Sequence, residues 1–187
     1  MAGTEEHHGA DLDHCANLFG ALSLVVADRT TDAVAGAAHQ SVTAATALSA
    51  LHHFLDAPPI DLLRQVLGLT SSGTVRLVDR LVDAGHVRRQ RGADGRSTLI
   101  TLTPEGRRAA EQVSTARADV LRGALAALSD AEVQTLEELA SRLLVGLMRG
   151  PGVVRWMCRL CDTDACGRGA GRCPVANAAR ERWSEAR

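Results

Sequence analysis

The sequence contains no lysine and no tyrosine, and its 187 residues include only two phenylalanines and two tryptophans. All 21 basic residues are therefore arginine, which forms paired hydrogen bonds to phosphate and guanine more readily than lysine does. No apolar run approaches the ~20 residues that span a bilayer. The acidic first residues also lack the positively charged start of a secretory signal. We therefore expect a soluble cytoplasmic protein.

The sequence also lacks the residue patterns of common enzymes. It has no glycine-rich phosphate loop and no pair of carboxylates placed for acid–base catalysis. Four closely spaced cysteines near its end would close the coordination sphere of a metal rather than leave a position for water. We therefore expect no enzymatic activity.

What the sequence does contain is an uneven distribution of charge. Residues 1–63 hold one arginine against eight Asp or Glu, residues 64–108 hold nine against four, and residues 109–187 hold eleven against ten. The basic middle segment suits a polyanion such as DNA, because neutralising phosphates releases counterions. On charge alone, a solvated basic face explains this segment equally well.

Hydrophobic periodicity and capping residues predict a mainly α fold with one small β-hairpin. Helices are expected over residues 11–35, 41–55, 60–67, 70–84, 103–128 and 129–147, and hairpin strands over 87–91 and 97–102. We divide the chain into a flexible N-terminus (1–10), N-terminal helices for core and dimerisation (11–57), a DNA-binding domain (58–103), C-terminal dimerisation helices (104–150) and a cysteine-rich tail (151–187).

A helix, a turn, a second helix and a hairpin in this order predict a winged helix-turn-helix, whose second helix enters the major groove of DNA. Hydroxyls at the start of that helix can donate to phosphates or base edges, and two arginines project along one of its faces. The candidates are Thr70, Ser71, Ser72, Thr74, Arg76 and Arg80, with Arg76 the best candidate for a base contact. The alternative is an exposed helix whose arginines pair locally with Asp79 and Asp83.

The tip of the hairpin offers three further candidates, Arg91, Asp94 and Arg96. A carboxylate beside arginines can hold one of them in the conformation that a narrow minor groove requires. The hairpin therefore predicts a second DNA contact.

Two stretches, LTSSGTVRLVDRLVDAGHVRR and DGRSTLITLTPEGR, resemble the MarR family of bacterial regulators. The resemblance covers about residues 12–148. It implies a winged-helix homodimer built by the first and last helices, which binds a pseudo-palindromic operator, usually as a repressor. It also implies that Arg96 enters the minor groove, and that a small phenolic or lipophilic effector can bind. A non-DNA interaction module is the weaker alternative, because the wing is basic.

The tail holds Cys158, Cys161, Cys166 and Cys173 at spacings of two, four and six intervening residues. Four thiolates within so short a segment can surround one zinc ion, which is the leading interpretation. An iron–sulfur cluster, which would make the protein a redox-sensing regulator, is an alternative because cluster motifs can end in Cys-Pro. Redox-active thiols and an inert tail remain open. Nearby arginines would offset thiolate charge.

The other cysteine and the histidines have simpler interpretations. Cys15 is expected to be a buried apolar residue of the first helix. His39, His52 and His53 are expected to be surface or satisfied core histidines rather than metal ligands. For His86, contact with a phosphate and plain exposure are equally open.

Overall fold

The computed structural model describes residues 4–93, 95, 97–150 and 152–183, and this part of the chain forms eight helices and one two-stranded sheet. The prediction of a mainly α fold with one hairpin is confirmed. The elements are α1 (Thr4–Ala38), α2 (Val42–His53), α3 (Ile60–Leu67), α4 (Ser71–Asp83), β1 (Val87–Arg91), β2 (Thr98–Leu102), α5 (Pro104–Leu125), α6 (Asp130–Gly146), α7 (Val153–Met157) and α8 (Pro174–Trp183).

Two boundaries differ from expectation. Helix α1 begins at Thr4 rather than Asp11, because no proline precedes Pro58 to stop the helix. The tail contains two short helices, α7 and α8, that the sequence analysis did not predict. None of the described helices is long and apolar enough to cross a membrane.

The DNA-binding domain has one hydrophobic core, to which α2, α3, α4 and the hairpin all contribute. Its largest fully buried side chains include Leu48, Leu63, Leu77, Leu81 and Ile100. Leu77 and Leu81 lie one helical turn apart on α4, and Ile100 points inward from β2. Both positions agree with the hydrophobic periodicity of the sequence. Because one core joins α3, α4 and the hairpin, these elements hold a fixed arrangement.

The turn between α3 and α4 follows from local chemistry. Gly68 ends α3 in the left-handed conformation, with φ of 66°, which glycine adopts without steric cost. Thr70 then caps α4, since its hydroxyl accepts a hydrogen bond from the Gly73 amide at 3.1 Å. The tight connection between the two helices therefore depends on these neighbouring residues.

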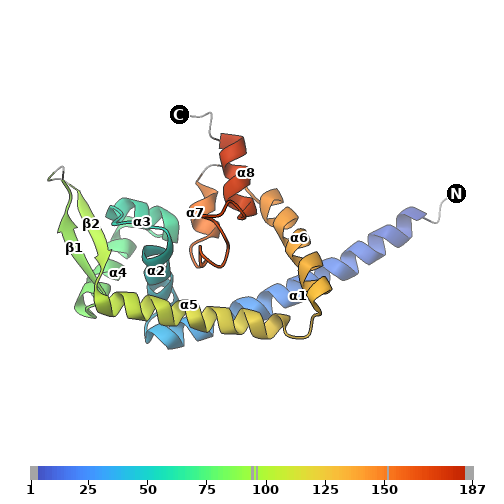
Figure 1. The fold of residues 1–187 in the computed structure, drawn as a ribbon, viewed down its shortest axis with the longest axis horizontal. Helices are drawn as coiled ribbons and strands as arrows, with labels where there is room; N and C mark the ends of the chain where they lie inside the picture. The colour runs from blue at the N-terminus through green and yellow to red at the C-terminus, as the bar shows by residue number, and fades with distance from the viewer. Residues whose placement is uncertain (1–3, 94, 96, 151, 184–187) are drawn as a thin grey trace.

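The hairpin is anchored to the domain at its base. Its antiparallel register runs from Val87 opposite Leu102 to Arg91 opposite Thr98. The Ile100 amide donates to the Pro58 carbonyl at 3.0 Å, so the segment before α3 pairs with the outer edge of β2. The free end of the hairpin projects away from the body of the molecule (Figure 1).

The junction between the hairpin and α5 is tightly packed. The Thr103 hydroxyl donates to the Gly85 carbonyl at 2.6 Å and accepts from the Gly106 amide at 3.0 Å, which caps α5. A Cβ atom added to Gly106 would lie 1.8 Å from the His86 carbonyl oxygen. Only glycine therefore fits at this position.

The long helices α1 and α5 pack along each other, and the N-terminal part of α1 extends beyond them (Figure 1). Helix α6 has no buried residue in the single chain. Both α1 and α6 leave rows of large apolar side chains in solvent. These rows are unusual for a monomer, whose surface rarely carries large continuous apolar patches.

Candidate nucleic-acid interface

Helix α4 presents the polar residues expected of a recognition helix. The side chains of Ser71, Ser72, Arg76 and Arg80 are exposed. The Arg76 Nε donates to the Ser72 carbonyl at 3.3 Å, which leaves the end of its guanidinium directed away from the core. Among the described residues, no acidic side chain lies within 4.0 Å of either Arg76 or Arg80. The predicted local ion pairs with Asp79 and Asp83 do not form.

The expectation for Thr74 is corrected. Its side chain is only 1% exposed, and its hydroxyl donates to the Thr70 carbonyl at 2.9 Å. Thr74 lies three and four residues before Leu77 and Val78, so it shares their buried face. Thr70 itself is exposed but its hydroxyl caps α4. Thr74 therefore cannot contact DNA from this position.

The hairpin adds exposed arginines beside α4. Arg88, Arg89 and Arg91 are all exposed on β1, and the Arg91 Nε donates to the Gly95 carbonyl at 2.9 Å, which braces the turn. Sequence reasoning placed Arg88 and Arg89 on the strand without assigning them a role. The predicted contact residues Asp94 and Arg96 lie outside the described residues.

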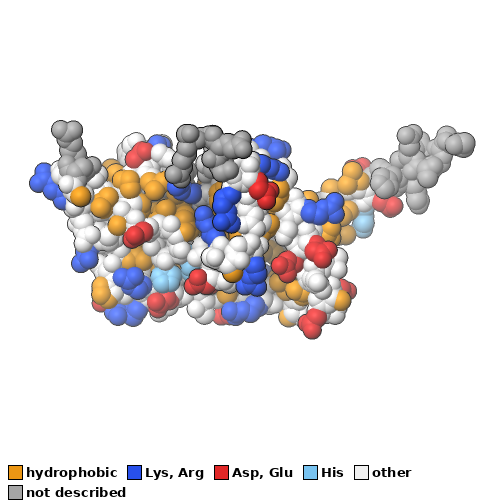
Figure 2. Space-filling view, turned by 45° about the horizontal axis from the view of Figure 1, so that its top comes forward, with side chains coloured by type: hydrophobic (Ala, Val, Ile, Leu, Met, Phe, Trp, Pro, Cys, Tyr) orange, Lys and Arg blue, Asp and Glu red, His pale blue; other side chains and the backbone are white. Residues whose placement is uncertain are grey.

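One ion pair connects the hairpin to the recognition helix. The Arg89 Nη2 lies 2.6 Å from the Asp79 Oδ1. Asp79 is thus occupied by the strand rather than by its helical neighbours. Arginine side chains flank the grey tip of the hairpin at the left of Figure 2. The exposed cations of α4 and of β1 therefore share one end of the molecule, which we call the reading head (residues 70–91).

The sequence model of the MarR family matches residues 41–97 of this chain. The matched segment contains α2, α3, α4 and β1, which build the core beneath the reading head. Over these residues the chain resembles the MarR family. Its sequence has no match among curated proteins.

Solved structures share the fold of this chain. A probable transcriptional regulator from Pseudomonas aeruginosa is 29% identical, with a TM-score of 0.51 over 66% of this chain and 95% of the other. Wild-type MarR from E. coli, in its apo form, is 23% identical, with a TM-score of 0.55 over 69% and 96%. A point mutant of MepR from S. aureus, solved with an oligodeoxyribonucleotide, is 18% identical, with a TM-score of 0.54 over 71% and 97%.

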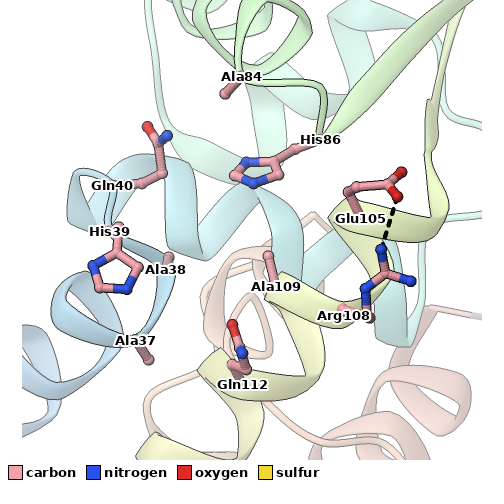
Figure 3. A pocket seen from close by; sticks show the side chains of 10 residues that line it. All are labelled: Ala37, Ala38, His39, Gln40, Ala84, His86, Glu105, Arg108, Ala109 and Gln112. Carbon is pink, nitrogen blue, oxygen red and sulfur yellow. Dashed lines mark hydrogen bonds and ion pairs between the residues drawn. The ribbon is translucent and has the colours of Figure 1, made fainter.

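A pocket of about 410 Å³ lies between the end of α1, the start of the hairpin and α5 (Figure 3). Several alanines line it, and the His86 ring points into it from the residue before β1. The His86 Nδ1 is buried and has no hydrogen-bond partner among the described residues. His86 is therefore half-buried rather than plainly exposed, and its contact with a phosphate stays a prediction. Glu105 and Arg108 form an ion pair at the pocket edge.

The predicted cysteines come together in the tail. Cys158 and Cys173 are buried in a small core with Met148, Val154 and Val175, and the side chains of Cys161 and Cys166 pack against it. All four cysteines are free thiols. Cys158 and Cys161 lie near enough to shift each other's pKa, and Cys173 lies near enough to shift that of Cys166. The four cysteines thus form two neighbouring pairs.

These contacts shift the pKa values of the thiols. The hydrogen bond from Cys158 lowers the pKa of Cys161 to about 6, with help from the positive charges of Arg117 and Arg168. The same hydrogen bond, together with burial, raises the pKa of Cys158. Burial and the contact with Cys173 raise the pKa of Cys166 to about 11. The Cys161 thiol therefore loses its proton more readily than those of Cys158 and Cys166.

The described residues contain no group of three or more His, Cys, Asp or Glu that already converges as a metal site. His53 instead forms a 2.7 Å hydrogen bond with Ser114 and lies 3.8 Å from Asp162. Burial lowers the pKa of His53, partly offset by the Asp162 carboxylate. His53 is the satisfied core histidine that we expected.

The prediction for Cys15 is wrong for the single chain. Cys15 is exposed and lies in the N-terminal half of α1. Its neighbours Leu12, Leu18 and Phe19 are also more than half exposed. The apolar stripe of α1 exists, but nothing in the described part of the same chain covers it.

Proposed function

We propose that two copies of this chain form a homodimer that binds a pseudo-palindromic DNA operator and represses transcription. The observation that carries this proposal is the placement of Arg76 and Arg80 on α4, both exposed and without an ion pair among the described residues, beside the exposed arginines of β1. The recognition helix would enter a major groove and the hairpin the adjacent minor groove or backbone. Repressors of this kind act by occupying DNA that the transcription machinery needs.

Selection from a randomised duplex library tests sequence-specific binding. We expect the purified full-length chain to enrich a pseudo-palindromic sequence whose half-sites lie about one helical turn apart. The affinity for that sequence should fall steeply as salt is raised, because arginines displace counterions from phosphates. Enrichment of no sequence, or of an isolated half-site, would contradict the proposal.

The dimer is supported by the uncovered apolar faces of α1 and α6. Leu139 and Leu143 are 48% and 52% exposed on α6, and Leu18 and Leu22 are each 57% exposed on α1. Burying such side chains stabilises an interface by about 1.5–3 kcal/mol each. A second copy of the chain carries the same apolar faces, and in a two-fold dimer the same surface of each subunit forms the interface. The two reading heads would then sit on one rigid frame.

Leu139→Asp is expected to dissociate the homodimer, because a carboxylate would be buried without a partner in the interface. Light scattering coupled to size exclusion should show a dimer for the unmodified chain and a monomer for the variant. Gln134→Asp is the matched control, since it adds the same charge to the same helix about 140° away around its axis. A dimer that persists in Leu139→Asp, or a monomeric unmodified chain, would refute this arrangement.

We also propose that the pocket beside His86 binds a small effector. Its alanine-lined wall suits an apolar group, and the unpartnered His86 Nδ1 suits a polar group of the ligand. A ligand there would touch both α5 and the residue that precedes β1, so it could change the position of the hairpin relative to the dimer helices.

A thermal-shift screen with small aromatic acids and phenols tests the effector pocket. Ligands that raise the melting temperature of the chain should lose this effect in His86→Phe, which keeps an aromatic ring in the pocket but removes the ring nitrogens. The exposed His14→Phe on α1 serves as the control. If His86→Phe leaves every stabilising ligand effective, the pocket is not their site.

A further inference from the structure

The tail forms a compact unit although it has few residues with which to build a core. Residues 153–183 contain two short helices joined by a loop that reverses direction. Gly167 and Gly171 have positive φ angles of 64° and 71° within this loop. Units of fewer than about 40 residues usually need a metal or disulfides to fold stably. No disulfide joins the described cysteines.

Hydrogen bonds from backbone amides stabilise the loop that carries the four cysteines. The Cys161 amide donates to the Cys158 carbonyl at 2.9 Å, and the Cys166 amide donates to the Asp162 carbonyl at 3.0 Å. The amide of Ala176 donates to the sulfur of Cys173 at 3.5 Å. Amide-to-sulfur hydrogen bonds of this kind stabilise a thiolate that ligates a metal.

The half-buried Arg168 lies beside the cysteines and has one unsatisfied guanidinium nitrogen. The Arg168 Nη1 is buried without a hydrogen bond to any group of the described residues. Its charge acts on Cys158, Cys161 and Cys166. A buried cation is costly unless an anion compensates it. Four thiolates around a divalent ion would carry a net negative charge that compensates this cation.

We propose that Cys158, Cys161, Cys166 and Cys173 bind one Zn²⁺ as thiolates, with Arg168 as the counter-charge of the complex. Binding releases the thiol protons to solvent and forms four sulfur–zinc bonds. Sulfurs around zinc lie about 3.8 Å apart, given bonds of ~2.3 Å in a tetrahedron. The four cysteines share one small core, and since no three of them converge as a metal site among the described residues, zinc binding would draw their sulfurs together.

The zinc site would also fix the tail against α2 and the small core between α1, α2 and α5. The Thr163 hydroxyl donates to the His53 carbonyl at the end of α2 at 3.0 Å. Leu160 packs on the small core formed by Val34, Ala38, Ala45 and Val113. These contacts come from residues that lie between the proposed ligands. Loss of zinc should therefore loosen the end of α2 as well as the tail.

Metal analysis of the full-length chain, purified without oxygen, tests the site. We expect one zinc per chain in the unmodified protein and in Cys15→Ser, and background zinc in the Cys158→Ser, Cys173→Ser double variant. Cobalt added to the metal-free chain should produce the thiolate-to-cobalt charge-transfer and visible bands of tetrahedral sulfur coordination. The cobalt spectrum needs no variant, so it decides the question even if the double variant fails to fold.

Three results would overturn the proposal. A brown protein with iron and acid-labile sulfide would show an iron–sulfur cluster instead. A metal-free chain with a Cys158–Cys161 disulfide would show a redox pair. Cobalt bound without sulfur charge-transfer bands would place the metal elsewhere.

The role of Arg168 is tested by competition with a chromogenic chelator. Arg168→Ala should weaken zinc binding by about 10- to 100-fold, as loss of groups around metal ligands typically does. Arg155→Ala is the matched control, because Arg155 is an exposed arginine of the same tail. Equal zinc affinity of both variants would remove Arg168 from the site.

The link to α2 is tested by amide hydrogen exchange. Chelation of zinc should speed exchange near residues 50–55 while leaving α4 unchanged, and unchanged exchange at α2 would reject the link. These measurements use no DNA, so their outcome is independent of the proposed operator binding.

Discussion

Arg76→Ala is expected to weaken binding to the selected operator by roughly 1–3 kcal/mol, or about 5- to 150-fold, and to relax the sequence preference at one position of each half-site. The reason is that Arg76 is exposed on α4 and has no acidic partner among the described residues, so its guanidinium is available for a base edge. Fluorescence anisotropy with labelled duplex at fixed salt measures the change.

The control for Arg76→Ala is Arg122→Ala, which removes an exposed arginine of α5 that pairs with Asp119. It should leave the operator affinity unchanged. Arg80→Ala is expected to weaken binding to all DNA sequences alike. It should also reduce the slope of log affinity against log salt concentration by about one, as the loss of one phosphate contact does. If Arg76→Ala binds as tightly and as selectively as the unmodified chain, α4 does not read the bases.

Gly106→Ala is expected to destabilise the chain by about 2–3 kcal/mol. The new methyl group would lie 1.8 Å from the His86 carbonyl oxygen, which belongs to the backbone and cannot rotate away. Either α5 or the base of the hairpin must move, and the cap formed by Thr103 would be distorted with it. Chemical denaturation followed by circular dichroism measures the free energy of unfolding.

Gly123→Ala provides the matched comparison, because it makes the same substitution in the same helix with nothing within 4 Å of the new carbon. Alanine favours a helix over glycine by about 0.5–1 kcal/mol, so this variant should be slightly more stable than the unmodified chain. Opposite signs for the two substitutions are expected. Equal effects would mean that the junction is looser than the structure shows.

The positions of α3, α4 and the hairpin could be predicted from the sequence, because neighbouring residues determine where each element begins and ends. Gly68 and Thr70 determine where α3 ends and α4 begins, and the capping box of Ser129 and Glu132 determines the start of α6. Such signals act over three or four residues, and they can be read without knowledge of the fold. The hairpin was likewise predicted by a local turn signal.

Other features were missed for physical reasons. Thr74 lies three and four residues before the buried Leu77 and Val78, and this spacing was a signal of burial. It was predicted to contact DNA because it carries a hydroxyl group. Pro174 at the start of α8 was also a readable helix signal. The ion pair of Arg89 with Asp79 joins a strand to a helix, and no local rule chooses that partner for Asp79. The exposure of Cys15 depends on what covers α1, which the sequence of one chain does not specify.

The Arg89–Asp79 ion pair and the common core of α4 and the hairpin restrict how any signal can act on DNA binding. In each subunit of the proposed dimer, α4 and the hairpin would bind their half-site as one rigid unit. An inducer would therefore change the distance between the two units rather than the contacts that either unit makes with DNA. A duplex with a single half-site should consequently be held with the same weak affinity whether or not the inducer is present. The spacing between the two half-sites, more than their base sequence, would then determine how strongly a given promoter responds to the inducer.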